Sequence, residues 1–127
     1  MGAGVLFISK GSVLLLQRNK NLSGNKWGGF WNLPGGTTDK GESHYQTAIR
    51  ESQEEIGSPP QGTYFFDHYS SPAYSVFFAD CPFKFKPILN EEHSAYAWVP
   101  VEQINRYKLH PREKNPLMYF CKRFQKS

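Results

Sequence analysis

The sequence predicts an α/β protein in which helices cover a mixed β-sheet. Short apolar runs typical of strands occur before and after one early amphipathic helix, and a second helix pattern closes the chain. Strands that surround one helix and lead into another indicate stacked layers. No apolar run approaches about eighteen residues, which argues against a membrane span. With 127 residues, the chain is expected to form one domain over residues 1–127 with a single core.

The first elements form a hairpin followed by a loop. Residues 4–8 and 12–17 are apolar runs separated by the short polar segment 9–11, which predicts two paired strands. Residues 19–29 are polar and rich in glycine, so we expect a loop there. Residues 30–33 form a short strand that a proline and a glycine pair bring to an end.

Residues 43–56 form the best-defined helix of the first half. Ser43 can cap its start, and Gln46 completes a capping box. Gly57 provides the C-terminal stop, and two prolines follow shortly after. The predicted buried face consists of Tyr45, Ala48, Ile49, Ser52 and Ile56. A hydroxyl on a buried face needs a partner, and we expect Ser52 to bond the carbonyl of Ala48.

The second half alternates strands and short helices. Three strand-like runs cover residues 63–69, 74–79 and 95–99. Residues 101–107 predict a short helix, and an Asn-Pro pair at 115–116 is a good start for a final helix. The predicted buried stripe of this last helix is Leu117, Phe120, Cys121 and Phe124.

Three glutamates crowd one side of the early helix near its C-terminus. Glu51, Glu54 and Glu55 have the spacing i, i+3 and i+4. Two unit charges about 6 Å apart repel by roughly 3 kcal/mol at an effective dielectric near 20, and the helix C-terminus favours cations. A solvated acidic face is the plain alternative. A bound divalent cation explains the arrangement better, and oxygen ligands favour Mg²⁺, with Mn²⁺ as a substitute.

The glycine pair before this helix completes the pattern. Gly35 and Gly36 permit a turn with positive φ and let a carbonyl reach a metal or a phosphate. Counting on from Gly36, the chain has five residues, Glu42, seven residues, and then R-E-S-Q-E-E-I-G from Arg50 to Gly57. Over residues 36–58 this spacing resembles the Nudix box, a glycine, five residues, a glutamate, seven residues and R-E-x-x-E-E-x-G.

The resemblance implies a fold, an activity and a set of site residues. The fold would be the Nudix α/β/α sandwich, and the activity would be Mg²⁺-dependent cleavage of a nucleoside diphosphate linked to a group X, giving a nucleoside monophosphate and phosphate-X. The compact length looks most like MutT-type nucleoside triphosphate pyrophosphatases. Metal ligands would be the Gly35 carbonyl with Glu51, Glu54 and Glu55. Arg50 resembles the family arginine that holds a catalytic glutamate in place.

Substrate contacts are predicted outside the box. Arg18 ends the second strand where MutT-like relatives often place an arginine that contacts phosphate. One of Trp27, Phe30 and Trp31 could stack on a base, with core packing as the alternative. By the resemblance, the general base would be one of the catalytic glutamates Glu51, Glu54 and Glu55. Several family members instead take it from a later loop, which makes Glu91 and Glu92 candidates. A solvated turn is the alternative for that pair.

Other classes of protein are disfavoured. A non-catalytic Nudix-like module that binds a nucleotide or an RNA end usually loses box glutamates, and this chain keeps them. An isomerase on the same fold needs a catalytic cysteine, for which Cys81 and Cys121 offer no match. The net charge of +4 would attract a polyanion, including nucleic acid, with a solubilising surface as the alternative. The resemblance implies a small-molecule nucleotide as the partner, with nucleic acid less favoured. We expect a cytoplasmic monomer or homodimer.

Overall fold

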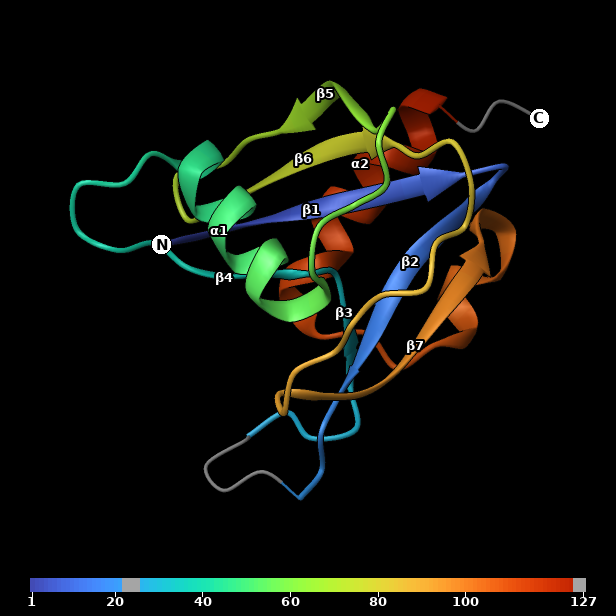
Figure 1. Cartoon of the computed structure of the whole chain (residues 1–127), viewed down its shortest axis with the longest axis horizontal. Helices are drawn as coiled ribbons and strands as arrows, with labels where there is room; N and C mark the ends of the chain where they lie inside the picture. Colours follow the sequence, from blue (N-terminus) through green and yellow to red (C-terminus); the bar gives the residue numbers. More distant parts are fainter. Residues whose placement is uncertain (22–25, 125–127) are drawn as a thin grey trace.

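The computed structural model describes residues 1–21 and 26–124, whose helices and strands form three layers (Figure 1). In chain order the elements are β1 (Gly2–Ser9), β2 (Ser12–Arg18), β3 (Trp31–Asn32), β4 (Gly35–Thr37), α1 (His44–Ile56), β5 (Tyr64–Tyr69), β6 (Tyr74–Asp80), β7 (His93–Pro100), the 3₁₀ helices η1 (Val101–Arg106) and η2 (Pro111–Glu113), and α2 (Lys114–Phe124). Figure 1 shows α1 in front of the sheet and α2 behind it. The predicted α/β/α sandwich is confirmed.

The sheet is mixed and has two arms joined at the β1–β2 hairpin. Strand β1 pairs in parallel with β6 from Gly2↔Tyr74 to Ile8↔Asp80, and the remaining pairings are antiparallel. One arm contains β1, β6, β5 and β4. In this arm β5 pairs with β6, and β4 pairs with the start of β1. In the other arm, β2 pairs with β3 and β7. The sequence did not predict β4 as a strand.

Alternate side chains of β1 pack in two different halves of the core. Val5 and Phe7 belong to the apolar cluster that includes residues of α1, whereas Leu6 belongs to the cluster that includes residues of α2. Successive strand residues point to opposite faces, so this is the packing expected for a strand buried on both sides. Helix α1 is therefore fixed against β1, with its acidic end near β4.

Most predicted elements are confirmed, with some corrections to burial. The capping box of Ser43 and Gln46 is present, and Gly57 ends α1 with φ of 78°. Tyr45 and Phe124 were expected to be buried, but they are 45% and 41% exposed. Both rings pack edge-to-face on aromatic neighbours at the sheet edge and stay open to solvent on their other side.

Two further expectations need comment. The hydroxyl of Ser52 donates to the carbonyl of Ile49 at 3.1 Å, one residue away from the expected partner Ala48, so it serves the i−3 position. The predicted loop 19–29 has no strand or helix in its described part, and residues 22–25 lie outside the described residues. Within the described part of the chain, no helix is long and apolar enough to cross a membrane.

Candidate active site

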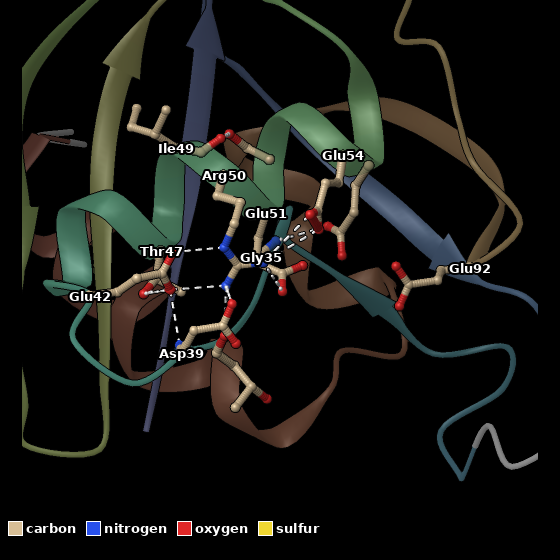
Figure 2. A network of polar contacts seen from close by, with 12 residues as sticks. Gly35, Asp39, Glu42, Thr47, Ile49, Arg50, Glu51, Glu54 and Glu92 are labelled. Atoms are coloured by element: carbon tan, nitrogen blue, oxygen red, sulfur yellow. Dashed lines mark hydrogen bonds and ion pairs between the residues drawn. The ribbon is translucent and has the colours of Figure 1, made fainter.

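Arg50 lies at the centre of an acidic network on the exposed side of α1 (Figure 2). Its guanidinium donates two hydrogen bonds to Glu42, from Nε at 2.7 Å and from Nη2 at 3.0 Å. Nη1 donates to Glu51 at 3.2 Å and approaches Glu54 at 3.5 Å. The bond to Arg50 lowers the pKa of Glu42 to about 2. The pair with Glu54 is thus the longer contact, and the bidentate pair with Glu42 fixes the arginine.

Glu55 points inward, toward the glycine pair of β4. Its side chain is buried, and its Oε1 accepts a hydrogen bond of 2.9 Å from the backbone N–H of Gly35. Burial raises the pKa of this carboxyl to about 8, and the charges of Glu92 and Glu51 act in the same direction. A buried carboxylate among other carboxylates is costly unless a cation or proton compensates it.

Glu51 lies directly against Gly36. A Cβ atom added to Gly36 would be 2.4 Å from the carboxyl carbon of Glu51, so only glycine leaves room for this carboxylate. A Cβ on Gly35 would be 2.6 Å from the carbonyl oxygen of Ala3. Neither glycine has a positive φ. The expectation that they serve a positive-φ turn is therefore wrong, because their role is close approach of backbone and carboxylate.

The predicted ligands come together around this glycine pair, although not as a closed cage. Glu51 and Glu55 flank Gly35 and Gly36, whereas Glu54 is more exposed and turns toward Arg50. Over residues 1–21 and 26–124, no three His, Cys, Asp or Glu side chains converge as a ready metal site. The oxygen donors, the buried charge of Glu55 and the space at Gly36 fit a hard divalent cation.

Of the two glutamates in the turn before β7, Glu92 faces the acidic network. Its charge raises the pKa of both Glu51 and Glu55. In Figure 2 the Glu92 carboxylate lies across an open gap from Glu54 and Gly35. The side chain of Glu91 is exposed, and its backbone carbonyl accepts a hydrogen bond from Asn19 at 3.1 Å. The turn thus presents one carboxylate to the site.

Arg18 lies opposite the glutamates and belongs to a cluster that sequence reasoning missed. Its Nη1 donates to Asn32 at 3.4 Å, and Asn32 contacts Nε2 of His93 at 3.3 Å. Burial and Arg112 lower the pKa of Arg18, while Glu55 and Glu92 raise it. The charges of Arg18 and Arg112 thus both interact with Glu55. Only the position of Arg18 at a strand end offered a signal in the sequence.

The predicted aromatic residues form a half-buried group at the end of the 19–29 loop. Trp27 packs edge-to-face on Phe30 with ring centroids 5.1 Å apart and on His110 at 4.9 Å. The ammonium group of Lys108 lies 4.4 Å from the Phe30 ring centroid. Trp31 instead contacts the α2-side core. Trp27 and Phe30 are therefore placed as a partly exposed aromatic surface with cations beside it.

An ion pair in η2 is joined to the residue that follows β3, shortly before the glycine pair. Glu113 is fully buried and accepts hydrogen bonds of 3.0 Å from Nε of Arg112 and from the backbone N–H of Leu33. The Arg112 guanidinium lies 5.1 Å from the ring centroid of Tyr74. No spacing rule linked these residues, since the Leu33–Glu113 bond spans 80 positions.

Together, the fold and this site define a class: an α/β/α sandwich whose first helix presents clustered carboxylates to a glycine pair on the adjacent strand. The model of the NUDIX domain matches residues 1–120, and the chain belongs to the Nudix family.

Individual relatives agree with this assignment. The chain is 36% identical over 89 residues to a nucleoside triphosphate pyrophosphatase/Nudix hydrolase fusion protein of Bifidobacterium longum, covering 65% of this chain and 18% of that protein. It is 39% identical over 57 residues to an 8-oxo-dGTP diphosphatase of Proteus vulgaris, covering 45% and 48%. The chain thus spans less than half the length of these relatives. The crystal structure of RenU, a Nudix hydrolase from M. smegmatis, superposes with a TM-score of 0.74 at 26% identity, covering 98% of this chain and 82% of that one.

Proposed function

We propose that this protein is a Mg²⁺-dependent pyrophosphohydrolase that cleaves a nucleoside triphosphate, or a derivative of one, to a nucleoside monophosphate and pyrophosphate or phosphate-X. The observation that carries the proposal is the placement of Glu51 against Gly36 and of Glu55 against Gly35. Arg50 meets four carboxylates in this network, so the oxygen donors carry more negative charge than it balances. A divalent cation supplies the balancing positive charge and is the usual cofactor for reactions at phosphate groups.

The box residues divide into ligands and a positioning residue. Glu51, Glu54 and Glu55, with the Gly35 carbonyl, would hold Mg²⁺ or Mn²⁺. When bound, the cation neutralises the diphosphate and lowers the pKa of a water molecule. Arg50 restrains Glu51 and Glu54 through its Nη1 donors, and Glu42 in turn fixes Arg50. This linkage keeps two acidic side chains at the site before a cation is bound.

Proton transfer and substrate contacts come from the opposite side. The charge of Glu92 acts on both Glu51 and Glu55, which supports it over Glu91 as the residue that accepts the proton of the attacking water. Arg18 carries a positive charge that interacts with Glu55 and Glu92, and it would contact phosphate oxygens. Trp27 and Phe30 offer ring faces or edges for a base.

The substrate class is supported by relatives rather than by the pocket itself. The relatives named as an 8-oxo-dGTP diphosphatase and as a nucleoside triphosphate pyrophosphatase fusion both act, by their names, on nucleoside triphosphates. We therefore propose a small-molecule nucleotide as partner and place nucleic acid second. Two free cysteines, Cys81 and Cys121, agree with a reducing compartment such as the cytoplasm.

The test is product release from a nucleotide panel in the presence of Mg²⁺. The panel contains canonical and oxidised deoxynucleoside triphosphates, ADP-ribose, dinucleoside polyphosphates, NADH and 5′-triphosphate RNA. Wild type is compared with Glu55→Gln, which keeps the shape of the side chain but removes its charge. We expect turnover to fall at least about a hundredfold, because a charge that holds the cation is lost.

A matched control is Glu102→Gln, the same chemical change at an exposed position of η1 away from the box. This variant should keep wild-type turnover. If no compound is hydrolysed, and Mg²⁺ does not raise the melting temperature, the hydrolase proposal is wrong and a nucleotide-binding module takes its place.

A further inference from the structure

The segment Leu33–Gly35, which leads into the glycine pair, is held mainly by groups outside its own strand. Leu33 and Pro34 lie between the short strands β3 and β4, and Gly35 begins β4. Glu113 accepts the N–H of Leu33 at 3.0 Å, and Glu55 accepts the N–H of Gly35 at 2.9 Å. The Leu33 carbonyl accepts from the side chain of Asn32 at 2.7 Å. The Pro34 carbonyl accepts from Val5 N–H at 2.9 Å.

The two carboxylates reach this segment from different layers of the sandwich. Glu55 belongs to α1, on one side of the sheet, and Glu113 is the last residue of η2, directly before α2, which covers the other side. Both side chains are buried, so neither hydrogen bond competes with bulk water. The backbone N–H groups of Leu33 and Gly35, two residues apart, are thereby each held by a carboxylate from a different layer. A shift of Leu33 would be transmitted through one proline residue to Gly35.

We propose that Glu113 is a positioning residue for the cation site: by holding Leu33, it sets where the Gly35 backbone meets Glu55. The inference rests on the proposed function, because it assigns a role toward the same site. Glu113 does not reach the cation itself, since its carboxylate is engaged by Leu33 and Arg112. Its effect is transmitted through the backbone, as for residues that orient metal ligands from behind.

A different role for Glu113 would be to neutralise Arg112 and nothing more. The two roles make opposite demands on the side chain. Positioning requires an acceptor that reaches Leu33, whatever its charge. Neutralisation requires a negative charge near Arg112, whatever its reach. Two conservative substitutions separate these demands and should both leave the chain folded.

The experiment measures the Kd of Mn²⁺ alone by electron paramagnetic resonance, with no nucleotide present, for wild type, Glu113→Gln and Glu113→Asp. Glu113→Gln keeps an acceptor of the same length but loses the charge. Glu113→Asp keeps the charge but is shorter by one methylene. We expect Glu113→Asp to raise the Kd about tenfold and Glu113→Gln to stay close to wild type, since the acceptor positions the ligand segment.

Phe85→Ala provides a control for general loss of stability. Phe85 packs on Phe7 and Trp98 and makes none of the contacts that hold Leu33–Gly35. Its truncation should lower the melting temperature without changing the Kd of Mn²⁺. Amide exchange at Leu33 and Gly35, followed by nuclear magnetic resonance, should accelerate in Glu113→Asp and not in Phe85→Ala.

The outcomes separate this inference from the proposed function. If wild type binds Mn²⁺ and Glu113→Asp binds it equally well, Glu113 is only a charge partner of Arg112 and the inference is overturned. The same holds if Phe85→Ala weakens binding as much as Glu113→Asp does. If wild type binds no Mn²⁺, the cation site itself is wrong, and both the proposed function and this inference are rejected.

Discussion

Arg50 and Arg112 both lie among carboxylates, but the charges around them are balanced differently. Arg50 faces Asp39, Glu42, Glu51 and Glu54, so one positive charge meets four negative ones. Arg112 pairs with a single fully buried carboxylate, that of Glu113. The first region keeps an excess of negative charge at the surface, and the second is balanced inside the protein. A region whose charges remain unbalanced is the one that we expect to bind a ligand.

The comparison can be tested most strongly by replacing Arg112 with leucine. Glu113 would then be fully buried without its charge partner, and we expect a loss of about 3–5 kcal/mol in the free energy of unfolding. Urea unfolding followed by circular dichroism measures this loss. The double variant Arg112→Leu with Glu113→Leu should recover much of the stability, because both charges are removed. A small effect of Arg112→Leu would show that water already compensates Glu113.

The titration of His93 tests the region around Arg112 through the pH dependence of stability. Burial, followed by the charges of Arg18 and Arg112, lowers its pKa from 6.5 to about 4. Between these values the unfolded chain binds the proton and the folded protein does not, so stability is complete above about pH 6.5 and is lost as pH falls toward 4. The expected loss from this residue is about 3 kcal/mol.

The measurement compares urea unfolding of wild type and His93→Gln at about pH 7 and about pH 4.5. Glutamine keeps an acceptor for Asn32 but does not titrate. Its loss of stability over this range should be smaller than that of wild type. Equal losses would show that His93 is already charged in the folded protein, and would contradict the positive surroundings inferred for it.

The variant Arg50→Leu tests the other region of the comparison, the acidic network around Arg50. Because Arg50 is partly exposed and its partners are on the surface, the melting temperature should change little. Turnover should nevertheless fall about 10–100-fold, since Glu51 and Glu54 lose the donor that orients them. The ratio of kcat to KM, measured beside the melting temperature, checks this. A large stability loss with unchanged turnover would reverse the roles that we assign to the two arginines.

The same contrast explains what could be predicted from the sequence. The capping box of Ser43 and the carboxylates of α1 follow from local spacing, because a helix brings residues three and four apart to one side. The sheet and the two covering helices followed from hydrophobic patterns. Glu113 and its bond to Leu33 were missed because no short-range rule connects residues 80 positions apart.

Burial at the edges was less predictable than the elements themselves. Tyr45 and Phe124 have helical spacing that fits a buried face, yet each lies where the sheet ends, and part of its surface stays open. The spacing of Gly35 and Gly36 predicted the site that we propose, but the expected positive φ of these glycines was wrong. Their φ values are ordinary, and the need for glycine came from the approach of Glu51 and of strand β1, which only the folded chain reveals.

The long separation in sequence between Leu33 and Glu113 also affects when each residue is synthesised. A ribosome adds about 5–20 residues per second, so the 80 positions between the two take about 4–16 s to synthesise. During that interval the box helix already exists as nascent chain, while the acceptor for Leu33 does not. The cation site that we propose is therefore expected to mature only once η2 has been made and Glu113 has reached Leu33.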